Sequence, residues 1–325
     1  MSLTLQEALA EGCRRLAEAG IEESALESEL FLRHILEAGI VDVYLRYDEK
    51  LTPQQRQAYF DLISRRIAGE PSAYITGQRE FFGIPFYVNP SVLIPRPETE
   101  LLVEKALEAA SSLSKHHRSE EPPSSSGPLI ETSVGTGSGN PVPSSQNSQL
   151  PTHDPPLVIS DIGTGSGIIA VVLAKRLPGA KVYAVDISPD ALATARRNAR
   201  RHSVADRITF LEGSLVSILP KAADIIVGNL PYVKSSELPP TGEPRCALDG
   251  GSEGLDVIQK LLRQVPAKLK PGGVLLLEIG FGQREQVVRL VKDALPGAKV
   301  ETFWDLSRIP RVIMASTTSK ATEGV

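Results

Sequence analysis

Residues 158–176 constrain the fold of this 325-residue chain more than any other stretch. A short apolar run is followed by glycines at alternate positions, Gly163, Gly165 and Gly167, and then by a second apolar run. The pattern predicts a buried strand, a tight glycine turn and a helix packed on a sheet. Because glycine has no Cβ, the backbone at such a turn can bend sharply and approach a ligand closely.

Two carboxylates flank this turn in the sequence. Asp186 ends a second strand-like run, nineteen residues after Gly167, which is where an acid can bind ribose hydroxyls. The glycines are spaced Gly-x-Gly-x-Gly, unlike the Gly-x-Gly-x-x-Gly of a dinucleotide site, and Asp161 precedes them. A carboxylate there disfavours a pyrophosphate but suits an ammonium or sulfonium group. A glycine turn alone would be weak support, but with both acids it predicts an S-adenosylmethionine site.

From residue 158 onward, predicted strands and helices alternate. This order is typical of an α/β fold with a mostly parallel sheet that binds ligands at the carboxyl ends of its strands. The expected strands are 158–162, 181–185, 208–211, 224–229, 273–279, 299–304 and 310–315, and the expected helices are 168–176, 190–202, 255–269 and 285–295.

The residues before this region predict a smaller helical part. Ser24 is a candidate N-cap for one helix, and Thr52-Pro53 is a strong helix start. A hairpin is expected over 80–88, with its turn at 83–85. We divide the chain into a helical domain (1–73) that is expected to recognise the substrate or support the fold, a hairpin linker (74–97) and an α/β domain (98–325) that contains the predicted S-adenosylmethionine site.

Residues 111–156 have a different composition from the rest of the chain. Ser, Pro and Gly supply 24 of these 46 positions, which predicts a disordered insertion. Residues 134–139 repeat the letters of the glycine turn, but no strand precedes them, so we assign them no cofactor role. His116, His117 and His153 also fall here, and we expect no metal site because nothing would fix their geometry.

Composition excludes several classes of function. The net charge of −4 argues against binding mainly through nucleic-acid phosphates, so a nucleic-acid partner is not expected. The four arginines at 196–197 and 200–201 are interpreted as a solvated helix face. No apolar run approaches the ~20 residues of a membrane helix, and the N-terminus lacks a secretion signal. Cys13 and Cys246 have no metal-ligand spacing, so we expect a cytoplasmic protein without a metal.

The expected fourth strand ends in Asn229-Leu-Pro-Tyr232, beside the first strand and the glycine turn. A carboxamide or adenine amino nitrogen is a poor nucleophile because its lone pair is delocalised. The Asn229 side-chain oxygen and the Leu230 carbonyl could each accept one of its N–H groups and hold it in line with a methyl group. Pro231 would fix the turn and Tyr232 could stack on the planar group. Alone, this motif could be an ordinary loop; after the fourth strand of such a fold it predicts catalysis.

Several blocks together resemble the release-factor glutamine N5-methyltransferases, the HemK/PrmC family. The specific signals are Pro95-Arg-Pro-Glu-Thr-Glu100 and the 243–250 block, because general methyltransferases lack them. The resemblance covers nearly all of the chain outside the insertion and rests on 69–77 (Gly-Glu-Pro-x-x-Tyr-Ile-x-Gly), 81–83 (Phe-x-Gly), 93–100, 161–167 and 243–250 (Glu-Pro-Arg-Cys-Ala-Leu-Asp-Gly).

The resemblance implies a small N-terminal helical domain joined by a β-hairpin to a seven-stranded, Rossmann-like class I methyltransferase domain. It implies S-adenosylmethionine-dependent methylation of the glutamine in the Gly-Gly-Gln motif of class I peptide-chain release factors. The implied cofactor residues are Asp161, Gly163, Thr164, Gly165, Ser166, Gly167, Asp186, Leu215 (near the adenine) and Asn229, and the implied glutamine-binding residues are Asn229, Leu230, Pro231 and Tyr232, with Arg96 added from the 93–100 block.

Two departures from the family pattern bear on the substrate. Leu230 stands where the family usually has proline, and Ser214 stands where an acid is common. Leucine keeps the carbonyl acceptor, but Asn-Leu-Pro-Tyr is also the form found in rRNA adenine N6-dimethyltransferases. A nucleic-acid adenine N6-methyltransferase therefore stays open as an alternative. A binding module without turnover is a third, which the intact Asp161, Asp186 and Asn229 disfavour.

Overall fold

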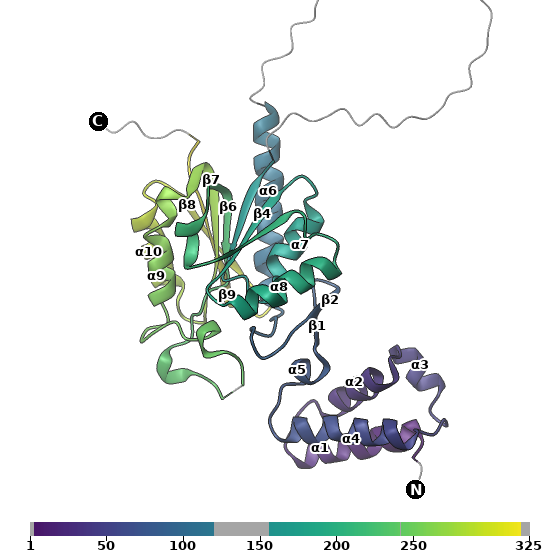
Figure 1. The fold of residues 1–325 in the computed structure, drawn as a ribbon. Coiled ribbons are helices and arrows are strands. Elements are labelled where there is room, and N and C mark those ends of the chain that lie inside the picture. The colour runs from purple at the N-terminus through teal and green to yellow at the C-terminus, as the bar shows by residue number, and fades with distance from the viewer. Residues whose placement is uncertain (1–2, 120–155, 241, 320–325) are drawn as a thin grey trace, which may run out of the picture.

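The computed structural model describes residues 3–119, 156–240 and 242–319. Figure 1 shows a small helical lobe at the N-terminus and a larger lobe in which helices cover a central sheet. Most of the expected insertion, including the glycine copy at 134–139 and His153, lies outside the described residues. Within them, no helix is both long and apolar enough to cross a membrane.

Four helices form the small lobe around a core of its own. Thr4 and Thr52 each cap a helix through a reciprocal pair of hydrogen bonds, as expected for Thr52. Ser24 is not the cap that was predicted: it is the first residue of the second helix, Glu23 takes the cap position, and the Ser24 hydroxyl contacts the Cys13 thiol at 3.6 Å. The helices are α1 (Leu5–Glu18), α2 (Ser24–Leu36), α3 (Ile40–Leu45) and α4 (Pro53–Ile67), and their core includes Leu5, Leu16, Phe31, Tyr59 and Ile63.

A short helix and a hairpin connect the two lobes (Figure 1). They are α5 (Ser72–Thr76), β1 (Gln78–Phe81) and β2 (Ile84–Tyr87). The turn lies at Phe82 and Gly83, which have φ of 53° and 72°, so the predicted turn at 83–85 was one residue late. Positive φ at both central residues is the conformation of a type I′ two-residue hairpin turn. The Glu100 carboxylate accepts a hydrogen bond of 2.7 Å from the Phe82 N–H and holds this unusual residue in place.

The large lobe contains the seven-stranded, mostly parallel sheet that the sequence predicts. Its strand order is β5-β4-β3-β6-β7-β9-β8, with β9 antiparallel to both of its neighbours. The chain leaves β3 towards one edge and returns to β6 on the other side, so the switch point lies between β3 and β6. The strands are β3 (Val158–Ile162), β4 (Lys181–Asp186), β5 (Ile208–Glu212), β6 (Ala223–Gly228), β7 (Leu269–Glu278), β8 (Lys299–Trp304) and β9 (Pro310–Ser316).

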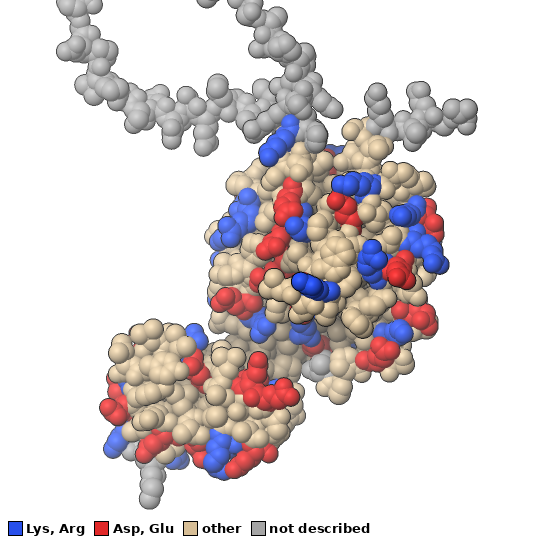
Figure 2. Space-filling view, turned by 180° about the vertical axis from the view of Figure 1, so that it is seen from behind, with Lys and Arg blue, Asp and Glu red and all other residues tan. Residues whose placement is uncertain are grey.

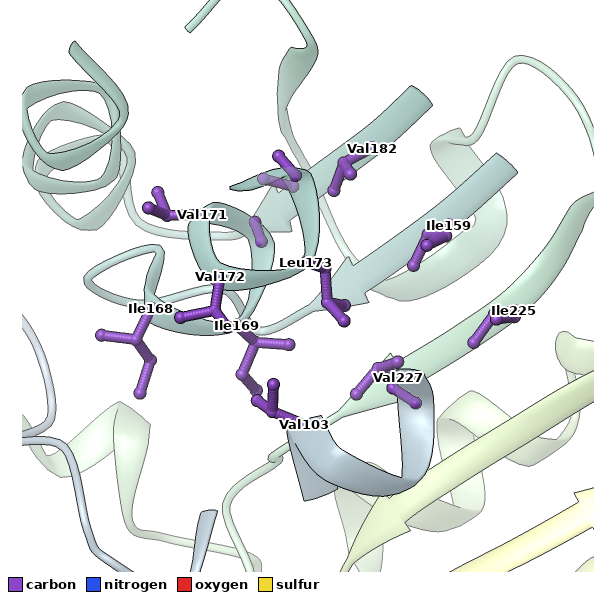
Figure 3. Close-up of a cluster of buried hydrophobic side chains, with 14 of the residues drawn as sticks. Val103, Ile159, Ile168, Ile169, Val171, Val172, Leu173, Val182, Ile225 and Val227 are labelled. Atoms are coloured by element: carbon purple, nitrogen blue, oxygen red, sulfur yellow. The ribbon is translucent and has the colours of Figure 1, made fainter. Parts of the chain in front are cut away.

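Alternate residues of each strand enter different cores on the two faces of the sheet. Ile159, Ile225 and their equivalents pack under α6, α7 and α8, and Val158 and Ile226 pack under α9 and α10. In Figure 3, Ile169 and Leu173 of α7 point towards the strands. The helices are α6 (Thr99–Ser119), α7 (Ile168–Arg176), α8 (Pro189–Arg201), α9 (Asp256–Leu262) and α10 (Arg284–Ala294).

Two predicted boundaries were wrong. Residues 111–119, counted above with the insertion, continue α6: Ser111 and Ser114 donate hydrogen bonds to carbonyls four residues earlier, and Leu113 packs on the core. The serine-rich composition predicted disorder, but a helix accommodates these serines because their hydroxyls bind its carbonyl groups. The helix expected over 255–269 ends at Leu262, because Pro266 lies in a separate turn of 3₁₀ helix and β7 already begins at Leu269.

Candidate active site

A cavity lies at the carboxyl ends of β3, β4 and β6, where the switch point predicts a ligand site. The segments that surround it are far apart in the sequence: the 91–96 segment with Thr99, the glycine turn, the end of β4, the loop after β5, the motif after β6, the 246–247 loop and Val257 of α9. Among the predicted site residues, the lining includes Arg96, Gly163, Thr164, Gly165, Ser166, Asp186, Leu215, Asn229, Leu230 and Pro231; Asp161, Gly167 and Tyr232 lie outside it.

The backbone of the glycine turn is hydrogen-bonded within the protein. Gly163 and Thr164 both donate to the Val185 carbonyl at 2.9 Å, and Gly167 donates to the Thr164 carbonyl at 2.8 Å. Gly165 donates to Asp186 Oδ2 at 2.9 Å, and Asp186 Oδ1 accepts from the Ser188 N–H at 2.9 Å. These N–H groups are therefore occupied. In an anion site, by contrast, free backbone N–H groups bind the phosphate. The free lone pairs of Asp186 can accept hydrogen bonds from ligand hydroxyls.

Gly167 joins this turn closely to α8, which leads to a stability prediction. Its φ is +81°, and a Cβ added there would lie 2.9 Å from Ala195 Cβ. We expect Gly167→Ala to lower the unfolding free energy by about 2 kcal/mol, from overpacking and strain. Thermal unfolding measures the effect, with Gly179→Ala as the control because no atom lies within 4 Å of a Cβ there. Equal melting temperatures for the two variants would contradict the packing described.

Asp161 lies behind the glycine turn and is fully buried. Its Oδ2 accepts hydrogen bonds from the Thr164 hydroxyl at 2.6 Å and the Ala170 N–H at 3.1 Å. Its Oδ1 has no hydrogen-bond partner among the described residues. Burial raises the pKa of Asp161 to about 7. An unpartnered carboxylate oxygen beside a turn whose amides are occupied fits a cationic ligand, so the residues present are compatible with S-adenosylmethionine.

Leu215 supports the opposite wall of the cavity. It is mostly buried and has a φ of +59°, which is uncommon for a residue with a side chain. Such strain occurs most often at ligand sites. This backbone conformation directs the Leu215 side chain to the wall of the cavity, at the end of the loop that follows β5.

Asn229 and Leu230 meet the glycine turn directly. A Cβ added at Gly163 would lie 3.1 Å from Leu230 Cδ2 and 3.5 Å from the Asn229 carbonyl oxygen. Leu230 is buried, and its side chain fills the space between Gly163 and Gly228, which explains how leucine is accommodated here. Asn229 Nδ2 donates a hydrogen bond of 3.1 Å to Thr99 Oγ1. Among the described residues, none donates to Asn229 Oδ1 or to the Leu230 carbonyl, so both are free to accept.

Tyr232 does not line the cavity, where it was expected to stack on a planar group. Its ring lies against Gly280, and its hydroxyl donates a hydrogen bond of 3.2 Å to Glu278 Oε1. Gln283 Nε2 donates to the Tyr232 carbonyl at 2.9 Å. Tyr232 therefore anchors the motif to the end of β7. Sequence reasoning missed Glu278, although an acid at the end of an apolar strand was a signal that could have found it.

Arg96 is paired within the protein. Its guanidinium forms an ion pair with Glu243, which is buried and also accepts a hydrogen bond of 2.9 Å from the Ile94 N–H. Two segments 149 residues apart in sequence are thus joined across the cavity. The 93–100 and 243–250 blocks of the sequence meet at this point.

Asn198, which sequence reasoning also missed, links the hairpin to the glycine turn. Its Nδ2 donates to the Ser166 carbonyl at 2.8 Å and the Tyr87 carbonyl at 2.9 Å, and its Oδ1 accepts from the Tyr87 N–H at 2.8 Å. Every hydrogen-bonding position of the amide except one lone pair is used. The hairpin therefore has a fixed place relative to the cavity.

The arginine cluster of α8 is exposed as predicted, but two of its members also cover aromatic rings: Arg197 lies over Tyr87 and Arg196 over Phe210. On the face shown in Figure 2, positive and negative side chains are interspersed, without a continuous basic surface. Within the described ranges, no three His, Cys, Asp or Glu side chains are grouped so that they could hold a metal ion.

The sheet order and the acid-flanked glycine turn define a Rossmann-like methyltransferase of the class that uses S-adenosylmethionine. A family model described as "Methyltransferase domain" matches residues 153–300, and one described as "PrmC N-terminal domain" matches residues 7–77.

Full-length relatives give a narrower assignment. The release factor glutamine methyltransferase of Geobacter sulfurreducens is 39% identical over 84% of this chain and 83% of its own length. The proteins of that name from Moorella thermoacetica and Koribacter versatilis are 37% and 35% identical, over 89% and 96% of this chain and 90% and 98% of theirs. The chain belongs to the release factor glutamine methyltransferase family.

Proposed function

We propose that the protein methylates the side-chain nitrogen of the glutamine in the Gly-Gly-Gln motif of class I peptide-chain release factors. The observation that carries this proposal is the pair of unpaired acceptors, Asn229 Oδ1 and the Leu230 carbonyl, in the same cavity as the glycine turn. A primary carboxamide has two N–H groups, one for each acceptor. The names of the relatives supply the identity of the substrate.

In this proposal, the cofactor site is formed by the glycine turn and its acids. Asp186 accepts hydrogen bonds from the ribose hydroxyls, and Leu215 contacts the adenine. Asp161, buried behind the turn, places a negative charge near the ammonium group, and that cation would lower the raised pKa of the carboxyl. Gly163, Thr164, Gly165 and Ser166 form the surface against which the cofactor would lie, and Gly167 joins this turn to α8. When bound, S-adenosylmethionine supplies a methyl group on a positively charged sulfur.

The chain's own contribution to the reaction is orientation and electrostatics. Asn229 and the Leu230 carbonyl hold the amide nitrogen with its lone pair towards the methyl group, and their hydrogen bonds strengthen as positive charge develops on nitrogen. Pro231 and Tyr232 keep the motif rigid. The N–C bond forms as the S–C bond breaks, and the nitrogen then loses a proton to water. Arg96, held by Glu243, closes the side of the cavity where the glutamine enters. Because release factors act in translation termination, we propose a cytoplasmic location.

Mass spectrometry tests this function directly. The full chain is incubated with isotopically labelled S-adenosylmethionine and either a class I release factor or naked ribosomal RNA, and the label is located in each acceptor. We expect label on the glutamine of the Gly-Gly-Gln peptide and none on RNA. Label on adenine instead would mean that Asn-Leu-Pro-Tyr reports a nucleic-acid substrate, and the proposal would be withdrawn.

A further inference from the structure

Glu278 is a buried carboxylate to which the proposed reaction assigns no role. It ends β7, and its residue is 2% exposed. The sheet register pairs Gly228 with Leu277, so the next residues along these parallel strands are Asn229 and Glu278. Glu278 therefore lies beside the proposed catalytic residue Asn229, at the end of the neighbouring strand.

Glu278 is connected to Asn229 through one hydroxyl. Asn229 Nδ2 donates to Thr99 Oγ1 at 3.1 Å, and the buried Thr99 hydroxyl in turn interacts with the Glu278 carboxyl, whose pKa it lowers. Tyr232, from the same motif as Asn229, donates to Glu278 Oε1. Glu278 Oε2 has no partner of good hydrogen-bond geometry among the described residues.

The direction of these hydrogen bonds follows from what each group can donate. An ionised carboxylate only accepts, and a hydroxyl has a single proton to give. If Thr99 donates its proton to Glu278, its oxygen can only accept from Asn229, which must then present Nδ2 to Thr99 and Oδ1 to the cavity. With no carboxylate behind it, Thr99 could donate to Asn229 Oδ1 instead. The amide could then turn over and present N–H groups to the N–H groups of the substrate.

We propose that Glu278 is a positioning residue which, through Thr99, sets the side-chain amide of Asn229 so that its oxygen faces the substrate nitrogen. This inference rests on the proposed function of Asn229. It deepens that function by naming what holds the acceptor in its productive orientation.

The charges around Glu278 determine when it is ionised. Burial raises its pKa to about 7, and hydrogen bonding by Thr99 and Tyr232 opposes this shift. Glu98 raises the pKa further and Arg311 lowers it; Arg311 is itself paired with Asp305 at 2.9 Å and Glu98 at 3.6 Å. The orienting form is therefore populated above about pH 7. We expect kcat to rise as the pH increases through this range.

A buried carboxylate is costly for stability, which argues for a functional reason to keep it. Its pKa in the folded protein lies above its ordinary value of 4.5. The folded state therefore binds the proton more tightly, and stability is lost as the pH rises through the folded pKa. At pH 8, Glu278→Gln should melt no lower than the wild type. If Glu278 served only to stabilise the fold, Glu278→Gln would melt at a lower temperature than the wild type.

The test uses the full chain with the acceptor that wild-type enzyme methylates. We expect Glu278→Gln to lower kcat by about tenfold to a hundredfold, the range typical of lost support for a reacting group. The Kd for S-adenosylmethionine should change by less than about twofold, because Glu278 does not line the cavity. The rise of kcat near pH 7 should disappear in the variant. A wild-type kcat with an unchanged pH profile would overturn the proposal.

A matched pair of variants at Thr99 separates this route from the link through Tyr232. Thr99→Val keeps the shape but removes the hydroxyl, and should lower kcat as Glu278→Gln does. Thr99→Ser keeps the hydroxyl, and should recover most of the loss. The double variant Thr99→Val with Glu278→Gln should be no slower than the slower single variant, since both break one chain of hydrogen bonds. Additive losses would overturn the proposal.

These ratios are independent of the substrate assignment. Whether the wild type methylates a release factor tests the proposed function, and the ratio of variant to wild type tests the positioning. The ratio can be measured on a release factor or on adenine, since both present a planar nitrogen with N–H groups. Failure of one proposal is therefore distinguishable from failure of the other.

Discussion

Asn229→Ala is expected to lower kcat for methylation of the release factor by about 100- to 1,000-fold, the effect of removing one group that stabilises developing charge. The variant loses the Oδ1 acceptor and leaves the substrate nitrogen free to rotate. The Kd for S-adenosylmethionine should rise by no more than about fivefold, equivalent to one neutral hydrogen bond. Single-turnover kinetics and calorimetry measure the two quantities separately.

Ser236→Ala is the control for this variant, because Ser236 is exposed and lies outside the cavity a few residues beyond the motif. It should behave as wild type in both measurements. If Asn229→Ala transferred methyl groups at close to the wild-type rate, the proposed mechanism would be wrong. If it lost cofactor binding and transfer together, Asn229 would belong to the cofactor site and its role in orientation would be unsupported.

Asp186→Ala is expected to raise the Kd for S-adenosylmethionine by at least about 100-fold. Two hydrogen bonds from ligand hydroxyls to a charged acceptor are lost, at about 1.5–3 kcal/mol each. The substitution also leaves the Gly165 and Ser188 N–H groups without the carboxylate that accepts from them, so the turn loses its shape. Calorimetric titration with S-adenosylmethionine measures the effect.

Asp190→Ala provides the comparison, since Asp190 is an exposed carboxylate in the first turn of α8 and lies outside the cavity. The Kd of Asp190→Ala for S-adenosylmethionine should match that of the wild type. A similar Kd for Asp186→Ala would show that the ribose is bound elsewhere, and the assignment of the cavity would need revision. A large loss in both variants would indicate a general effect of negative charge near α8.

Local signals predicted the large lobe well. The glycine turn was predicted because its strand, turn and helix follow one another within twenty residues. The two acids were identified from their spacing relative to this turn. The mostly parallel sheet followed from the regular alternation of elements, and the fourth strand of the domain lies beside the first as expected. Thr52 was found as a cap because threonine followed by proline signals a helix start, and the structure adds a capping box with Gln55.

The errors occurred where long-range contacts overrode local preference. Phe82 has positive φ because Glu100, eighteen residues away, holds its N–H. Residues 111–119 are helical although their composition suggested otherwise, since Leu113 finds a core to pack on. Tyr232 was expected in the cavity, but a carboxylate 46 residues away binds its hydroxyl.

The sequence by itself determined the class of fold, the glycine turn with its acids and the Asn229 motif, because each is a pattern of neighbouring residues with its own local physics. Only the tertiary structure decided what orients those groups. Asn229 and Thr99 are 130 residues apart, Ile94 and Glu243 are 149 apart, and Asn198 and Tyr87 are 111 apart. No spacing along the chain encodes such pairs, since they are set by which strand ends and loops the folded sheet brings together.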